Sequence, residues 1–261
     1  MNIVLVHGIL GFSKIGIVDY FRGIAEHFQG SRVFAPKLDP TRGIEVRGTQ
    51  LRDQITAAFD SGELDPQQKT HIIAHSMGGL DSRFVLSPAN PDRIKLQIRS
   101  LTTISTPHLG SPIADLLDSG EKLFQHLPFA AGNDPLQAAL NHLNISLDGL
   151  RDLTTDRCRT FTNQFFNDPN VAYFSVAGTG RGSFPETAAG FLLFHHQILA
   201  KTGQPNDGLV TTASAQFGTF DPETWPGDHA EEVGYNLDNL AIPPPFYLGK
   251  YDRILANVRN L

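Results

Sequence analysis

The segment "THIIAHSMGGLDSR" (Thr70–Arg83) indicates the fold more strongly than any other part of the sequence. Its apolar first half ends at Ser76, a glycine-rich break follows, and the remainder is polar and compatible with a helix. This order is typical of the Gly-x-Ser-x-Gly turn, which exposes a serine hydroxyl between a strand and a helix. Ala74 stands in the place of the first glycine and is nearly as small. The segment therefore predicts either a reactive serine or an ordinary strand–turn–helix connection.

Short apolar runs alternate along the chain with segments of helical spacing. The runs are apolar on both faces and end at Gly, Pro or Ser, as buried parallel strands do. The expected strands are residues 2–7, 32–38, 70–76, 100–106 and 171–178, and the expected helices are 17–29, 47–59 and 78–86. Strands that alternate with helices form βαβ units, so we expect a single α/β domain over residues 1–261. Its mostly parallel central sheet should be flanked by helices, with functional residues at the carboxyl ends of the strands.

Two regions interrupt this alternation and are more apolar than surface connections should be. They are residues 109–150 and 183–200. One interpretation is that they supply additional helices to the core. The other, which we favour, is a helical lid at 111–150 and a second cap segment at 183–200, each covering an apolar cleft.

Composition excludes several classes of partner. The chain has 261 residues, a net charge of −6 and a pI near 5.9, whereas nucleic-acid binding requires a basic surface. The same charge disfavours docking on anionic membranes, and no apolar run is long enough for a transmembrane helix. Met1-Asn2 leads directly into a strand-like run, without the pattern of a secretory signal. We therefore expect a cytoplasmic protein, or one exported by a signal-independent route.

The chain has one cysteine, Cys158, so an internal disulfide is impossible. Nothing near "TDRCRTF" suggests an activating base, and we expect a buried, unreactive thiol.

A serine becomes a nucleophile only with a base, which in turn needs an orienting acid. In α/β-hydrolases the three residues follow the order Ser, Asp or Glu, His. That order allows Ser76, Asp207 in "NDGLV" and His229 in "DHAEEVG", but it also allows other acids. The order alone leaves four rival histidines open, which are His126, His142, His195 and His196.

The segment "VHGILG" (6–11) ends the first predicted strand in a glycine-flanked turn. Such a loop can supply a backbone N–H to an oxyanion hole. The expected donors are the amides of Ile9 and of Met77, the residue after the serine. His7 is expected to be a structural hydrogen-bonding residue.

The chain resembles the bacterial triacylglycerol lipases of the Pseudomonas and Burkholderia type, within the α/β-hydrolase superfamily. The similar segments occur in the same order over most of the chain. They are "LVHGILGF", "GIVDYFRGI", "EVRGTQL", "IIAHSMGGLDSRFV", "TTISTPHLGSPIAD", "NDGLV" and "DHAEEVG".

This resemblance implies that Ser76 is the nucleophile, Asp207 the acid and His229 the base, with Ile9 and Met77 as oxyanion donors. It also implies a mobile lid within 111–150 and a fatty acyl ester substrate, bound at a lipid–water interface.

Some positions depart from the family's pattern. Ala213 stands where the family has a cysteine of its disulfide. The resemblance also implies a structural calcium ion, held by an acid two residues after the triad histidine and by another before the triad aspartate. The corresponding candidates are Glu231 and Glu186, with Thr187 at the aligned place of the second acid. The ester chemistry itself requires no cofactor.

The sequence thus predicts a serine carboxylic-ester hydrolase, with a lipase as the first hypothesis. A short-chain carboxylesterase, a thioesterase or a polyester depolymerase would use the same triad. Two further alternatives are a non-catalytic lipid-binding protein of this fold and a zinc hydrolase using His195 and His196. Adjacent helical residues point about 100° apart, which suits shared zinc ligation poorly.

Overall fold

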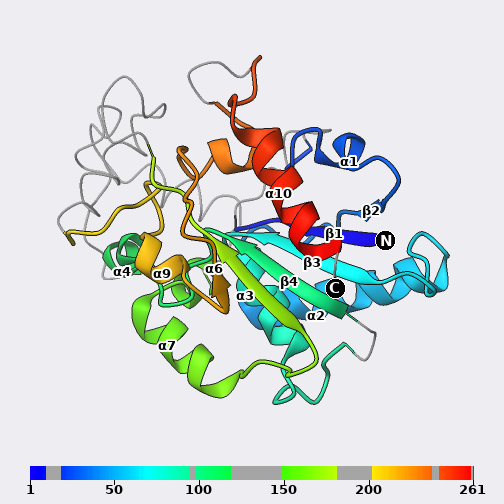
Figure 1. Ribbon diagram of the computed structural model, residues 1–261. Helices are drawn as coiled ribbons and strands as arrows, with labels where there is room; N and C mark the ends of the chain where they lie inside the picture. Colours follow the sequence, from blue (N-terminus) through cyan, green and yellow to red (C-terminus); the bar gives the residue numbers. More distant parts are fainter. Residues whose placement is uncertain (10–18, 95–97, 119–147, 181–201, 237–240, 260) are drawn as a thin grey trace, which may run out of the picture.

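The computed structural model describes residues 1–9, 19–94, 98–118, 148–180, 202–236, 241–259 and 261. Its centre is a six-stranded, fully parallel sheet in the order β2-β1-β3-β4-β5-β6 (Figure 1). The strands are β1 (Asn2–Val6), β2 (Arg32–Phe34), β3 (Thr70–His75), β4 (Ile98–Ile104), β5 (Ala172–Val176) and β6 (Thr219–Phe220). The predicted parallel sheet is confirmed.

The expectation that all five predicted strands are buried on both faces is wrong for β2, and the first three residues of β5 are also only half-buried. Arg32 is exposed, and Val33 and Phe34 are only half-buried. The reason is position, since β2 pairs with β1 alone and lies at the edge of the sheet. Strand β6, at the other edge, was not predicted because two residues carry no readable alternation.

Helices cover both faces of the sheet. The longer ones are α2 (Ile44–Asp60), α3 (Met77–Leu86), α7 (Thr155–Gln164) and α10 (Tyr247–Arg259). The shorter ones are α1 (Ile24–His27), α4 (Pro112–Asp118), α6 (Asp148–Asp152), α9 (Thr212–Ala215) and the 3-10 turn η2 (Glu231–Val233). Helices α2 and α3 match the predicted segments 47–59 and 78–86, whereas α1 occupies only part of 17–29.

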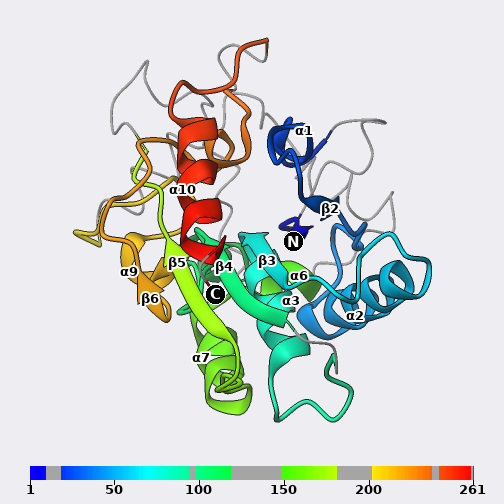
Figure 2. The ribbon, with the colours of Figure 1, turned by 45° about the vertical axis from the view of Figure 1, so that its right-hand side comes forward.

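Strand β1 shows how the two cores are divided. Ile3 and Leu5 join α1 and α10 in one apolar cluster, while Val4 and Val6 join α2 and α3 in another. Successive strand residues point to opposite faces, so a wholly apolar strand is buried on both. Figures 1 and 2 show α10 and α1 on one side of the sheet and α2 and α3 on the other.

The chain changes direction across the sheet next to β1, because β2 pairs on one side of it and β3 on the other. Ligands of open parallel sheets bind at such a switch point, beyond the carboxyl ends of the strands. The loop after β1 carries Gly8 and Ile9, and Ser76 directly follows β3. The topology therefore brings two predicted site segments to one edge of the sheet.

The predicted lid at 111–150 falls largely on residues 119–147, which lie outside the described residues, and the cap segment 183–200 lies outside them entirely. The described start of the lid region is α4, and its described end belongs to α6. Among the described helices, none combines the length and apolar character needed to cross a membrane.

Candidate active site

Ser76 occupies a strained turn between β3 and α3. Its backbone has φ 55° and ψ −132°, a region that residues other than glycine rarely adopt. Two hydrogen bonds hold this conformation: Ser76 N donates to the Ile104 carbonyl at 2.9 Å, and Thr106 Oγ1 donates to the Ser76 carbonyl at 2.7 Å. The predicted tight turn at the serine is confirmed, and the neighbouring strand β4 maintains its strain.

The small residues after Ser76 let α3 approach β1 and β4 closely. A Cβ added at Gly78 would lie 2.5 Å from the Val6 carbonyl oxygen, and one at Gly79 would overlap the Thr106 side chain. Real Cβ contacts are not this short, so both positions require glycine. This approach places the N-terminus of α3 beside the end of β1.

Asp207 lies fully buried in the Asn-Asp-Gly turn that the sequence predicts. Its Oδ1 accepts hydrogen bonds from the backbone N–H groups of Leu209 (2.8 Å) and Val210 (2.7 Å). Gly208 follows with φ 96°, a conformation that favours glycine. The turn thus fixes one carboxylate oxygen and directs the other toward His229.

His229 Nδ1 lies 2.7 Å from Asp207 Oδ2, and His229 N donates to the Asp207 carbonyl at 3.0 Å. Its ring centroid is 4.3 Å from that of His75, the residue immediately before the serine. Within the described part of the chain, no hydrogen bond joins His229 to Ser76 Oγ. Such contacts are often longer in ligand-free sites and shorten when substrate binds. The structure therefore pairs His229 with Asp207 and packs the His229 ring against the residue that precedes Ser76.

The loop after β1 is fixed by His7, which is buried. Leu38 N donates to His7 Nε2 at 2.9 Å, so the ring proton is on Nδ1, which donates to the Gly8 carbonyl at 2.8 Å. Burial and the nearby Arg47 lower the pKa of His7 to about 4, so the ring is neutral at pH 7. The predicted structural role of His7 is confirmed.

Arg47 is a site-supporting residue that the motif reasoning missed. Its side chain is fully buried and pairs with Asp81 of α3 at 2.7 Å. It also donates to the backbone carbonyls of His7 (2.8 Å) and Asp39 (2.7 Å). The available signal was its place on α2, four residues before the buried Leu51 and on the same helical face.

The expected oxyanion donors flank the serine. A Cβ on Gly8, directly before Ile9, would lie 2.7 Å from Ser76 Cβ, so the loop after β1 touches the serine side chain. Met77 is the first residue of α3, and a first helical N–H has no partner within its helix. The positive end of the helix dipole is at this same point. The loop after β1 and the N-terminus of α3, which carry the two expected donors, thus both adjoin Ser76.

The other sequence candidates have different outcomes. Cys158 is fully buried, which confirms the predicted buried thiol, and burial raises its thiol pKa to about 12. The rival histidines His126, His142, His195 and His196 lie outside the described residues.

Of the candidate calcium ligands, Glu231 alone lies within the described residues. Glu231 is buried, and its Oε2 accepts a hydrogen bond from Asp228 N at 3.1 Å, while Asp228 Oδ1 accepts one from Glu231 N at 3.0 Å. This reciprocal pair is a capping box, which already engages one oxygen of Glu231. Glu186 and Thr187 lie outside the described residues, so calcium binding stays a prediction.

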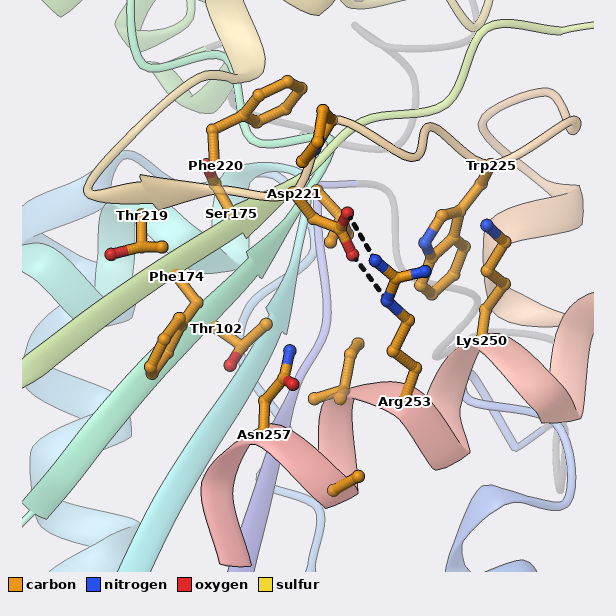
Figure 3. Close-up of a pocket in the computed structure, with 14 residues that line it drawn as sticks. Thr102, Phe174, Ser175, Thr219, Phe220, Asp221, Trp225, Lys250, Arg253 and Asn257 are labelled. Atoms are coloured by element: carbon orange, nitrogen blue, oxygen red, sulfur yellow. Dashed lines mark hydrogen bonds and ion pairs between the residues drawn. The ribbon is translucent and has the colours of Figure 1, made fainter. Parts of the chain in front are cut away.

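A hollow of about 580 Å³ lies apart from these residues, between α10 and the strands β5 and β6 (Figure 3). Its rim holds the ion pair between Arg253 and Asp221, whose closest atoms are 2.9 Å apart. None of Ser76, Asp207 and His229 lines it.

The chain is similar in sequence to a family of esterases and to known lipases. Residues 3–128 match the family described as "Putative serine esterase (DUF676)". The chain is 29% identical over 260 residues to a triacylglycerol lipase of Vibrio cholerae, covering 88% of this chain and 78% of that protein. It is 29% identical over 264 residues to a triacylglycerol lipase of Pseudomonas fragi, covering 89% and 87% of the two chains.

A similar solved structure is that of the Bacillus licheniformis lipase BlEst2 in its mature form. It matches with a TM-score of 0.66 and 26% identity, over 89% of this chain and 86% of that one. The predicted resemblance to the bacterial triacylglycerol lipases is therefore confirmed, and the chain has the α/β-hydrolase fold of lipases and serine esterases.

Proposed function

We propose that the protein is a serine hydrolase that cleaves carboxylic esters, with Ser76 as nucleophile, His229 as base and Asp207 as acid. The observation that carries the proposal is the 2.7 Å hydrogen bond between His229 Nδ1 and Asp207 Oδ2, next to a serine on a strained turn. Nucleophile, base and orienting acid form the arrangement that activates a serine hydroxyl.

In the first half of the reaction, Ser76 Oγ attacks the ester carbonyl and His229 Nε2 takes its proton. Asp207 holds the proton on Nδ1, which keeps Nε2 available as the base, and stabilises the imidazolium that forms. The C–O bond to the alcohol then breaks, and His229 returns the proton to the leaving oxygen. In the second half, His229 activates water, which releases the acid from Ser76.

The negative charge of the tetrahedral intermediate falls on the former carbonyl oxygen. We assign its stabilisation to the backbone N–H groups of Ile9 and Met77, supported by the N-terminus of α3. Loss of one such donor typically reduces kcat by about a hundred- to a thousandfold.

For the substrate we propose fatty acyl esters, including triacylglycerols. The printed names of the V. cholerae and P. fragi relatives and the apolar segments 111–150 and 183–200 support this choice. A lid over an apolar groove would favour long acyl chains presented at a lipid–water interface.

The nucleophile is tested with a fluorophosphonate probe, which labels activated serines. We expect wild-type protein to be labelled and to hydrolyse nitrophenyl esters, and Ser76→Ala to lose both while keeping its unfolding midpoint. A folded wild-type protein that resists the probe would refute the triad and favour a non-catalytic binding protein.

The substrate class is tested with nitrophenyl esters of increasing chain length and with emulsified triolein. We expect activity on long chains and an increase above the solubility limit. Activity restricted to soluble short esters would leave the triad intact but replace the lipase by a short-chain carboxylesterase.

A further inference from the structure

A second buried carboxyl group, that of Glu232, lies beside the acid–base pair. It belongs to η2, three residues after His229, and is fully buried. Its Oε2 is 3.8 Å from His229 Nδ1 and 3.0 Å from His75 Nε2. The triad as proposed above assigns no role to Glu232 or to His75.

Residues that follow β4 and β5 hold this carboxyl group in place. Ser105 has φ 43°, the second positive value among the described non-glycine residues, and its Oγ donates to Glu232 Oε1 at 2.7 Å. The Gly178 N–H donates to the same Ser105 Oγ at 3.0 Å. A Cβ on Gly178 would overlap Glu232 Oε1, so the carboxyl packs directly on backbone.

On its other side the carboxyl joins a chain of hydrogen bonds toward the oxyanion loop. His75 Nε2 contacts Glu232 Oε2, and His75 Nδ1 lies 2.8 Å from the Tyr20 hydroxyl. A Cβ on Gly8 would lie 2.9 Å from that hydroxyl, so the chain ends at the loop that carries Ile9. The 3.0 Å separation of His75 and Glu232 is that of a hydrogen bond.

The carboxyl groups of Asp207 and Glu232 differ in the hydrogen-bond donors and charged groups around them. Asp207 receives two backbone N–H groups and the His229 ring, as an ionised carboxylate does. Glu232 receives one hydroxyl and contacts the Asp207 carboxyl, and no described lysine or arginine forms an ion pair with it. The titratable groups that face it are His75, Asp207, Asp228, His229, Tyr20 and Tyr251.

Two carboxylates against one imidazole repel each other, so the one that receives fewer hydrogen bonds keeps a proton. Burial and the Asp207 charge both raise the pKa of Glu232. Burial and the neighbouring His229 lower the pKa of His75, which keeps that ring neutral.

We propose that Glu232 is a protonated positioning residue, whose O–H donates to His75 Nε2 while its other oxygen accepts from Ser105. His75 then carries its proton on Nδ1 and donates it to Tyr20. The fixed His75 ring packs at 4.3 Å against the His229 ring and holds its orientation between Asp207 and Ser76. Asp207 alone balances the imidazolium charge. This inference rests on the proposed hydrolase function.

The kinetic experiment compares Glu232→Gln with Glu232→Ala. A glutamine keeps both hydrogen bonds of a neutral acid, so we expect kcat/KM within about threefold of wild type and an unchanged acid limb of its pH profile. The alanine removes the hydrogen-bond partner of His75 Nε2, so we expect kcat to fall about tenfold, with a smaller change in KM. Glu223→Gln, which removes an exposed acid from the preceding loop, is the charge-matched control.

An ionised Glu232 would give a different result. Glu232→Gln would then remove a negative charge 3.8 Å from His229 Nδ1, and the acid limb would shift to lower pH by about one unit. That shift would overturn the protonated state. Wild-type kcat/KM in Glu232→Ala would overturn the positioning role.

A spectroscopic measurement separates this inference from the proposed function. The wild-type minus Glu232→Gln difference infrared spectrum at pH 8 should contain the C=O stretch of a protonated carboxyl group. Its absence would refute the inference whether or not the protein hydrolyses esters. Failure of the fluorophosphonate and ester assays with this band present would refute only the hydrolase function.

Discussion

Gly8 shows how little space the nucleophile leaves. The loop after β1 touches the serine, and a methyl group on Gly8 would lie 2.7 Å from Ser76 Cβ, 3.2 Å from Ser76 Oγ and 2.9 Å from the Tyr20 hydroxyl. Glycine is therefore required here for close approach, although its backbone conformation is not left-handed.

We predict that Gly8→Ala lowers kcat/KM for a soluble nitrophenyl ester by about a hundredfold or more, because the loop must retreat and carry the Ile9 amide away from the oxyanion. Gly249→Ala is the matched control, since a Cβ there meets nothing within 4 Å. Within α10 that change should stabilise the fold by up to about 1 kcal/mol and leave kcat/KM unaltered. Equal activities of the two variants would contradict the proposed contact between loop and nucleophile.

At the scale of elements, α2 holds β1 and α3 in place through a single side chain. Arg47 bonds the His7 carbonyl after β1 and the Asp81 carboxylate on α3. Both charged groups are fully buried, so neither can turn to solvent if its partner is lost.

We predict that Arg47→Met lowers the free energy of unfolding by about 3–5 kcal/mol, because it leaves Asp81 as an unpaired buried charge. Urea denaturation measures the change. Arg52→Met, on a more exposed part of the same helix, should cost less than about 1 kcal/mol. If Arg47→Met lowers the free energy of unfolding less than Arg52→Met does, Arg47 does not hold α2 against β1 and α3.

The elements differ in how far the sequence predicts them. Strands β1 and β3 are predictable because burial on both faces leaves a short run that is mostly apolar at its centre. Helix α10 was not among the predicted helices, although its buried residues recur with helical spacing. These residues are Tyr247, Tyr251, Ile254, Leu255 and Val258.

The candidate site was predicted from local turns at Ser76 and Asp207 and from the resemblance. The network of Glu232 and His75 was not, because 157 positions separate the two residues and neither segment contains a pattern that indicates the other. Arg47 is an intermediate case. The sequence indicates that it lies on the buried face of a helix, but it does not indicate which groups it pairs with. The periodicity of a sequence indicates which residues are buried, whereas the contacts between distant side chains depend on how the chain folds.

At the scale of the whole molecule, the reactivity of Cys158 measures how often the folded structure opens. It is fully buried in the cluster that joins α3, α4 and α7, and its thiol pKa is raised to about 12 by burial. A reaction with a thiol reagent therefore requires the structure to open.

We predict that a disulfide reagent at pH 8 labels the native protein about a thousandfold more slowly than the urea-unfolded protein, as an opening free energy of about 4 kcal/mol requires. Cys158→Ser should show no labelling in either state. Equal rates for native and unfolded protein would place the thiol at the surface and contradict the packing of α7.

The order in which the chain contributes its site has a consequence for synthesis. The serine and its turn come from the first third of the sequence, whereas the acid and the base come from positions 207 and 229 of 261. A growing chain can thus assemble β1, β3 and the strained turn long before it contains a group able to take the serine's proton. Until the ribosome has passed residues 207 and 229, the nascent chain cannot attack an ester or modify the molecules around it.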